Sequence, residues 1–265
     1  MPELAEVEYY RKQWNAGLGK RVLRVEVHEN TGLFRGMDAK EIVRLLPGMP
    51  YRHSFARGKQ MLFRFGAQAW IGLHLGMTGK LRTEGLPFRP TRHDHLVIRV
   101  EKVALVFRDP RQFGRVQFHR SSKPPDWWTR IPAAPTEPGF TQEAVQAFLA
   151  RHRRLPIKGT LLLQTGFPGI GNWMADETLW QAGIAPERKT GELSHAEMTS
   201  IWKTVRNISR IAMSTIGKDL SDPPRDWLFH ERWSRKGLCP KHKITLNSAA
   251  IAGRTTVWCE RCQRA

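Results

Sequence analysis

The chain has 265 residues, enough for two modest domains or for one domain with appendages. No apolar run is long enough to cross a bilayer, and the acidic start, with Glu3, Glu6 and Glu8, is unlike a secretory signal, so we expect a cytoplasmic, nucleoid-associated protein. The 43 Lys and Arg residues against 24 Asp and Glu residues leave a net charge of +19, which favours nucleic acid as the partner over the alternative of a membrane surface.

Residues 1–120 are predicted to form an antiparallel β-sandwich domain. A helix over residues 3 to about 18 comes first, because apolar residues there recur on one helical face. It is followed by short runs of apolar and β-branched residues separated by Gly and charged turns. These predicted strands cover residues 22–27, 61–65, 69–75, 96–100, 103–107 and 116–118.

Pro2 precedes the first helix and is a candidate nucleophile. Methionine before a small residue is normally removed, so we expect Pro2 to carry a free secondary amine that can attack an aldehyde-like carbon. Glu3 and Glu6 lie within one helical turn and can move protons, which is the arrangement of a Schiff-base enzyme. The alternative is an ordinary helix start, with proline in the first turn and acidic residues at the positive end of the dipole.

Residues 121–140 contain five prolines and cannot hold a regular element for long, so they are predicted to link two domains. Beyond them, over residues 141–226, the apolar period becomes helical. Thr141 can cap a helix through about residue 150. Ser194 and Glu197 form a capping box ahead of a helix that runs to about residue 214.

Two further predicted helices, 157–164 and 172–183, flank a segment too rich in Gly and Pro to be helical, which we expect to form successive tight turns. Asn172 can cap the second helix. The free N–H groups at this helix start and the Asn172 side chain form a natural cradle for a phosphate oxygen. A nucleotide-cofactor loop is the alternative, but no strand with the required glycine spacing precedes it.

All three cysteines lie in the last 27 residues, which argues against a disulfide framework and for a local metal site. Cys239 and His242, then Cys259 and Cys262, give the spacing of one tetrahedral, structural Zn²⁺. The alternative is a chance cluster of cysteines. We therefore predict a metal-bound hairpin over residues 227–265 that holds Arg254 near its tip.

Five segments and this hairpin closely resemble the formamidopyrimidine-DNA glycosylase and endonuclease VIII family. They occur in family order over nearly the whole chain: Pro2–Glu8 (PELAEVE), His74–Gly79 (HLGMTG), Arg92–His95 (RHDH), Asp109–Gly114 (DPRQFG) and Gly169–Asn172 (GIGN). The resemblance implies a two-domain α+β fold. Its parts are an N-terminal antiparallel β-sandwich flanked by helices and a C-terminal helical domain with a helix-two-turn-helix motif and a zinc-finger β-hairpin.

The resemblance also implies a monomeric bifunctional DNA glycosylase and abasic-site lyase that acts on damaged double-stranded DNA. Pro2 would attack the sugar C1′, expel the base, and use the iminium for β- and δ-elimination. Glu3 would act as acid or base with support from Glu6. Lys59 matches the lysine assigned to β-elimination, and Arg254 the arginine assigned to δ-elimination.

The implied DNA contacts come from both predicted domains. The side chains expected to contact DNA are those of His74, His93, Arg111 and Arg153. Lys158 and Asn172 are expected to contact its phosphates. Met77, Arg111 and Phe113 would fill the gap left by an everted base, since a buried C1′ cannot be attacked. Without the resemblance, Met77 and Phe113 could equally be interior residues, an interior histidine would be the preferred interpretation of His74, and Lys59 and Arg153 would by default be solvated surface cations.

Three departures from the family pattern bear on function. Ala5 replaces a usual proline and His242 a usual cysteine, while residues 218–224 form a short, proline-stiffened segment instead of a longer Gly-Thr-rich loop. Preference for oxidised purines, oxidised pyrimidines or abasic sites, and for double or single strands, is therefore open. Two rival functions are a catalytically silent damage sensor on this fold and a zinc-ribbon transcription factor.

Overall fold

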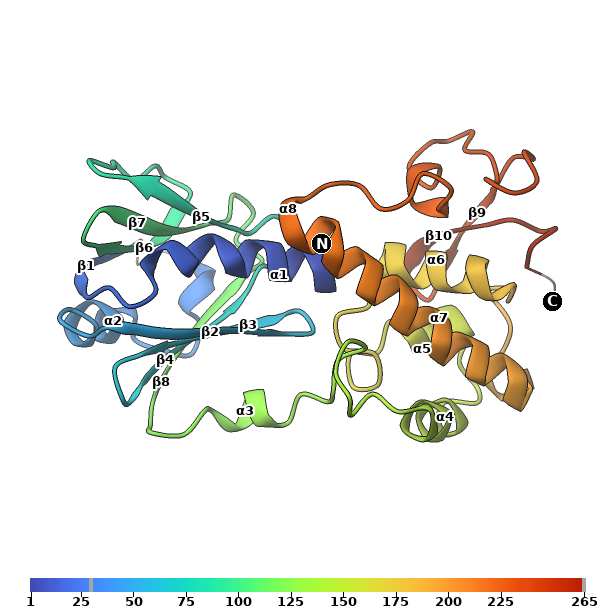
Figure 1. Ribbon diagram of the computed structural model, residues 1–265, viewed down its shortest axis with the longest axis horizontal. Coiled ribbons are helices and arrows are strands. Elements are labelled where there is room, and N and C mark those ends of the chain that lie inside the picture. Colours follow the sequence, from blue (N-terminus) through green and yellow to red (C-terminus); the bar gives the residue numbers. More distant parts are fainter. Residues whose placement is uncertain (29–30, 264–265) are drawn as a thin grey trace. The chain divides into compact units, whose positions relative to one another are not determined.

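The computed structural model describes residues 1–28 and 31–263, so the last two residues of the predicted 227–265 hairpin segment lie outside it. The chain divides into two compact units. One comprises Met1–Pro2 and Glu6–Ile131, and the other comprises Glu3–Ala5 and Pro132–Ala265 (Figure 1). Each unit has a hydrophobic core of its own, and Leu4 and Ala5 belong to the core of the second unit.

The first unit is built on two four-stranded antiparallel sheets, which confirms the predicted sandwich. One sheet has the order β1-β6-β7-β5, from Val22–Val27, Asp94–Val100, Val103–Arg108 and Lys80–Gly85. The other has the order β2-β3-β4-β8, from Tyr51–Arg57, Gln60–Phe65, Ala69–His74 and Arg115–Arg120. The strands β2 and β5 were not predicted, because polar and charged residues outnumber apolar ones in both.

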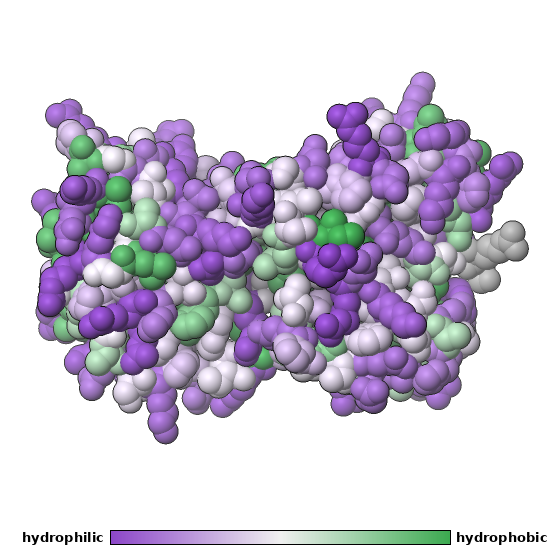
Figure 2. Space-filling model, viewed as in Figure 1, coloured by the Kyte–Doolittle hydropathy of each residue, from purple (hydrophilic) through white to green (hydrophobic). Residues whose placement is uncertain are grey.

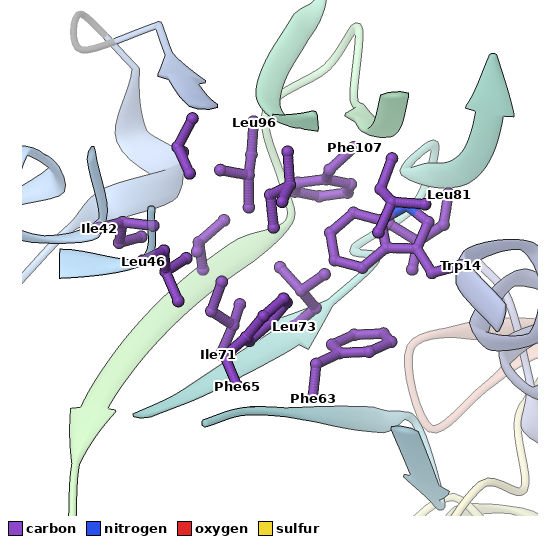
Figure 3. Close-up of a cluster of buried hydrophobic side chains, with 14 of the residues drawn as sticks. Trp14, Ile42, Leu46, Phe63, Phe65, Ile71, Leu73, Leu81, Leu96 and Phe107 are labelled. Atoms are coloured by element: carbon purple, nitrogen blue, oxygen red, sulfur yellow. The ribbon is translucent and has the colours of Figure 1, made fainter. Parts of the chain in front are cut away.

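Alternating side chains of the two sheets meet in one apolar core (Figure 3). Phe63 and Phe65 of β3 and Leu105 and Phe107 of β7 are fully buried there, as a period of two residues places them on the inner faces. Trp14 also enters this core and packs against Phe63, with ring centroids 4.7 Å apart. Burial of this apolar area is the main force holding the sandwich together.

Short helices surround the sandwich. The first predicted helix is α1, Leu4–Gln13, and it continues as a 3₁₀ turn, η1, over Trp14–Gly17. Three elements were not predicted, namely η2 (Gly32–Phe34), α2 (Ala39–Leu45) and α3 (Asp126–Thr129). The element α3 lies within the predicted linker, whose first part packs on the β2-β3-β4-β8 sheet through Trp128.

The second unit is mainly helical and follows the predicted capping signals. Its elements are α4 (Gln142–Arg151), α5 (Ile157–Leu161), α6 (Asn172–Ala182), η3 (Thr190–Glu192), α7 (His195–Ser214), α8 (Ile216–Asp219) and η4 (Leu228–His230). Thr141 accepts a hydrogen bond from the Ala144 N–H, and Ser194 with Glu197 forms the expected capping box. Two successive turns join α5 to α6.

A two-stranded hairpin closes the second unit, with β9 at Asn247–Ile251 and β10 at Arg254–Trp258. Its two turn residues, Ala252 and Gly253, both have positive φ, which suits the twist of a two-residue turn. Among the described residues, no helix has the length and apolar character that crossing a bilayer requires. On the face drawn in Figure 2 hydrophilic side chains predominate, and hydrophobic ones occur in separate small patches.

Candidate functional site

The carboxylate of Glu3 caps the N-terminus of α6. It is nearly fully buried, and its Oε2 accepts hydrogen bonds from the N–H groups of Gly171 at 2.8 Å and Met174 at 3.1 Å. Its Oε1 accepts a third from the Trp173 N–H at 3.0 Å. Because the N-terminal end of a helix attracts negative charge, Glu3 is fixed firmly, directly after Pro2 in the chain.

This arrangement corrects two expectations for the start of α6. Gly171, not Asn172, is the N-cap residue, and no side chain of the cap itself bonds to the helix. The three N–H groups expected to cradle a phosphate are occupied by Glu3. The protein therefore supplies its own anion at this helix start.

Gly171 is required for the close approach of Glu3. A Cβ built at this position would lie 2.3 Å from the Glu3 carboxyl carbon, far inside van der Waals contact. We expect Gly171→Ala to displace Glu3 and to lower the DNA nicking that the family resemblance implies on the order of 100-fold, because about 1 Å of misplacement in a catalytic site can cost that much. Single-turnover nicking of an abasic duplex measures this effect.

Gly217→Ala is the matched control in the same unit, since its Cβ would meet the nearest atom at an ordinary 3.4 Å. Equal nicking rates for Gly171→Ala and this control would show that the position of Glu3 does not matter for the reaction.

Arg254 is exposed at the first position of β10, next to the hairpin turn. The neighbouring Thr255 carbonyl accepts a hydrogen bond from Asn172 Nδ2 at 2.7 Å. The second unit therefore brings Glu3, Asn172 and the Arg254 hairpin together at the start of α6. The Asn172 Oδ1 is buried without a hydrogen-bond partner in the structure.

Lys158 lies in the interior, and its placement does not support the expected phosphate contact. It is 0% exposed, and its Nζ lies 2.5 Å from Asp176 Oδ1 and 2.8 Å from the Asn172 carbonyl. The other Asp176 oxygen pairs with Arg232 at 2.7 Å. Lys158 therefore belongs to a buried ion-pair network that ties α5 and α6 to the segment after η4.

We expect Lys158→Met to destabilise the protein by about 3–5 kcal/mol, because it leaves a buried carboxylate short of one partner. Arg153→Met is the control. Arg153 is exposed on the segment between α4 and α5, so its replacement should change the free energy of unfolding by less than about 0.5 kcal/mol. Urea unfolding of both variants tests this, and equal stabilities would contradict the buried role.

Lys59 and His74 are neighbours in the first unit. Lys59 occupies the turn between β2 and β3, and the register places His74 opposite Gln60. Burial, followed by the positive charges of Lys59 and Arg35, lowers the pKa of His74. Its Nδ1 accepts a hydrogen bond from the Gly76 N–H at 3.0 Å, so the neutral ring carries its proton on Nε2 and can donate.

The three residues expected to fill the gap in DNA lie on two adjoining loops. Met77 is 43% exposed and Phe113 is 50% exposed, and the Arg111 guanidinium lies over the Phe113 ring at 4.7 Å. Asp109 joins the loops, as it accepts hydrogen bonds from the Thr78 hydroxyl at 2.6 Å and the Gly114 N–H at 2.7 Å. Exposed apolar side chains on loops braced in this way suit a wedge.

Three other expected residues are half-buried, and one of them, His93, contacts the loop of Asp109, since its carbonyl accepts a hydrogen bond from the Asp109 N–H at 3.0 Å. His93 is half-buried before β6, where its Nε2 accepts a hydrogen bond from Arg92 at 3.0 Å. Glu6 is half-buried on α1, where its charge adds to the burial that raises the pKa of Tyr10. Pro2 is half-buried ahead of α1.

Cys239, His242, Cys259 and Cys262 come together as predicted and could hold a metal ion. Their ligand atoms lie within 4.8 Å of one another. Leu238 bridges to Thr245, so one ligand pair sits on a turn, and the other pair follows β10. Two of the sulfur atoms, on Cys239 and Cys259, belong to fully buried residues within a small apolar cluster.

Glu177 is a buried acid that the sequence analysis did not single out. The available signal was its position on α6, the helix that follows the Gly169–Asn172 motif. It is 1% exposed, and its Oε2 accepts a hydrogen bond from the Phe229 N–H at 2.9 Å. Burial raises the pKa of Glu177 to about 7, while hydrogen bonds from Gln181 and Phe229 oppose the rise.

The folded protein should therefore hold a proton on Glu177 between about pH 4.5 and 7 that the unfolded chain has lost. We expect the free energy of unfolding to fall as pH rises through this window, by up to about 3 kcal/mol. Glu177→Gln should remove this part of the pH dependence. Denaturation of both proteins at pH 5 and pH 8 measures it, and parallel pH profiles would contradict the assignment.

Two family models match the chain. The model of the formamidopyrimidine-DNA glycosylase N-terminal domain matches residues 1–116, and that of the formamidopyrimidine-DNA glycosylase H2TH domain matches residues 131–222. The formamidopyrimidine-DNA glycosylase of Roseiflexus sp. is 33% identical, with 100% of each chain covered. The corresponding enzyme of Xanthomonas campestris pv. campestris is also 33% identical over 100% of each chain.

Solved structures agree with the sequence comparison. A Lactococcus lactis FPG mutant in complex with a Fapy-dG containing DNA superposes with a TM-score of 0.89 at 25% identity, covering 100% of both chains. The comparisons assign no role to any single residue of this chain, so the geometry above supplies the candidates.

Proposed function

Since the chain belongs to the formamidopyrimidine-DNA glycosylase family, we propose that it excises a damaged base from DNA and then cleaves the strand through an iminium formed at Pro2. The observation that best supports this is the Glu3 carboxylate, held by three backbone N–H groups directly after the proposed nucleophile. The family assignment makes the chain a DNA glycosylase of DNA repair, and the residue roles below are proposals.

In the proposed reaction the Pro2 nitrogen attacks the sugar C1′, the glycosidic bond breaks, and the base leaves with a proton. The C1′–O4′ bond of the sugar ring then breaks, O4′ takes up a proton, and an iminium forms between Pro2 and C1′. The resulting iminium acidifies the proton at C2′, whose removal expels the 3′ phosphate, and a second elimination expels the 5′ phosphate. Glu3 moves protons at the sugar with Glu6 in support. Lys59 serves the first elimination and Arg254 the second.

Met1 is 52% exposed, which suits its removal to free the Pro2 amine. The Leu4 N–H is bonded to the Gly169 carbonyl at 3.0 Å, so the segment after Pro2 is anchored independently of Met1. A fixed segment of this kind would present the amine in one orientation, which lowers the entropic cost of the attack.

Double-stranded damaged DNA is the proposed substrate. The net charge of +19 and the braced loops carrying Met77, Arg111 and Phe113 support binding with an everted nucleotide. His74 presents an Nε2–H donor that suits a phosphate, and His93, Arg153 and Asn172 are proposed as further contacts.

Zn²⁺ is the proposed metal, and the donor set fits it. Tetrahedral zinc places ligand atoms about 3.5–3.8 Å apart, given Zn–S near 2.3 Å and Zn–N near 2.0 Å. The Cys239 and Cys262 sulfurs are 3.6 Å apart, and His242 Nδ1 lies 3.3–3.9 Å from the three sulfurs. With four protein ligands the site is closed, so its role would be to hold the hairpin that carries Arg254.

The segment after α8 is compact, and this bears on the size of the damaged base that the protein can accept. The carbonyls of Pro223 and Pro224 face His230 Nε2 at 3.0 and 3.1 Å, which fixes this short segment to η4. A stiff, short segment covers less of an extruded base than a long loop would, so bulky bases are compatible with it.

Nicking of labelled duplexes tests the function. Duplexes with one oxidised purine, one oxidised pyrimidine or one abasic site should give cleaved strands on a denaturing gel, and an undamaged duplex should not. No cleavage of any duplex at high enzyme excess would instead support a silent damage sensor.

A further inference from the structure

The two sheets of the first unit differ sharply in charge. The β1-β6-β7-β5 sheet contains Glu26, Glu84 and Asp94, and arginines of the same sheet pair with them, Arg99 with Glu26 at 2.5 Å and Arg82 with Asp94 at 3.1 Å. The strands of the β2-β3-β4-β8 sheet contain no Asp or Glu. They carry five arginines and three histidines: Arg52, Arg57, Arg64, Arg115, Arg120, His53, His74 and His119.

The outer face of this basic sheet also carries aromatic rings. Phe63 and Phe65 of β3 point into the core, so Leu62 and Arg64 lie on the other face. The middle of that face is covered by the segment around α3, because a Cβ at Gly72 would lie 2.4 Å from the Trp127 ring. Figure 1 shows α3 beside this sheet.

The edge strand β2 remains uncovered next to α3. The rings of His53 and Phe55 lie 5.9 Å apart at an interplanar angle of 29°, and Phe55 is 42% exposed. Trp128 is 6.5 Å from Phe55, and the Arg57 guanidinium lies over the Trp128 ring at 5.9 Å. We refer to His53, Phe55, Arg57 and Trp128 as the β2 platform.

We propose that the β2 platform binds single-stranded DNA by stacking bases on Phe55 and His53. Proteins that bind single strands combine aromatic stacking surfaces with cationic side chains that follow the backbone, and both are present here. The segment α3 contains one acid, Asp126. Its negative charge is balanced by Arg130, whose guanidinium lies 3.7 Å from the Asp126 carboxylate, so it does not cancel the positive charge of the β2 platform.

A polyanion suits this face better than a protein partner does. An exposed aromatic pair would serve either, but strands with five arginines and no acid present only one sign of charge. The platform also leads directly to the β2–β3 turn that carries Lys59. A single strand on the platform would therefore be continuous with a residue proposed to meet the substrate.

The inference goes beyond the proposed function and does not depend on the chemistry at Pro2. Fluorescence anisotropy of the full chain with a labelled 12-nucleotide oligo(dT) measures it. We expect Phe55→Ala to weaken binding about 5- to 150-fold, the range for loss of one stacking ring. Phe55→Leu keeps an apolar side chain without a ring and should weaken binding to a similar extent.

Leu23→Ala is the matched control. Leu23 is 58% exposed on β1 of the acid-containing sheet, so its replacement should leave oligo(dT) affinity unchanged. All variants should keep the melting temperature of the parent protein and its nicking of an abasic duplex, which separates this inference from the proposed reaction. Unchanged oligo(dT) affinity in Phe55→Ala, or a loss in Phe55→Ala that Phe55→Leu restores, would overturn the proposal.

A photo-cross-link locates the strand independently. An oligonucleotide carrying 5-iodouracil should cross-link, on irradiation, to the peptide that contains residues 52–57. Cross-links confined to the loops of Met77 and Phe113 would place single-stranded DNA elsewhere and overturn the proposal.

Discussion

Replacement of Pro2 by glycine should reduce the borohydride-trapped covalent enzyme–DNA product at least on the order of 100-fold, with nicking falling in parallel. Glycine retains a primary amine, so a small residual adduct is expected. The loss would follow from the nucleophile itself, because the Glu3 carboxylate and the Leu4 N–H keep their own partners in α6 and at Gly169.

Glu8→Gln is the control on the same helix. It weakens an ion pair with Arg11 at 2.7 Å on α1 and should leave the trapped product unchanged. An undiminished adduct in Pro2→Gly would exclude Pro2 as the nucleophile. Detection of Met1 on fully active protein by mass spectrometry would exclude it as well.

Removal of the proposed Zn²⁺ should unfold the C-terminal hairpin and abolish nicking. Binding of a structural zinc contributes folding free energy directly, on the order of 10 kcal/mol in isolated zinc-finger peptides. The small apolar cluster around Cys239 and Cys259 is too limited to replace that contribution. His242→Ala should therefore lose bound zinc, measured by atomic emission, along with nicking.

His242→Cys provides the rescue, since four cysteines are also a common ligand set of structural zinc. This variant should retain zinc and keep a folded hairpin. Ser248→Ala, on the exposed part of β9, is the neutral control. If His242→Ala kept both its zinc and its activity, the four-ligand site would be excluded.

Local sequence signals predicted several elements correctly because the forces that form them are local. Thr141 and the Ser194–Glu197 capping box begin their helices as expected, and Gly183 ends α6 in the left-handed region. The cluster of Cys239, His242, Cys259 and Cys262 was predicted from spacing alone, since two short residue pairs need only one hairpin to meet. The strands β2 and β5 escaped prediction, as their exposed faces carry polar residues that mask the alternation.

The sequence by itself therefore determined the fold class, several helix starts, the cluster of three cysteines and one histidine and, through its motifs, the family. Only the tertiary structure decided which groups form hydrogen bonds and ion pairs with the buried charged side chains. Glu3 reaches the start of α6 across 168 residues of sequence and takes the N–H groups expected to bind phosphate, and Lys158 turns inward to Asp176. Local periodicity reports which residues are buried, but charges pair through space, so their partners are settled only when distant segments pack.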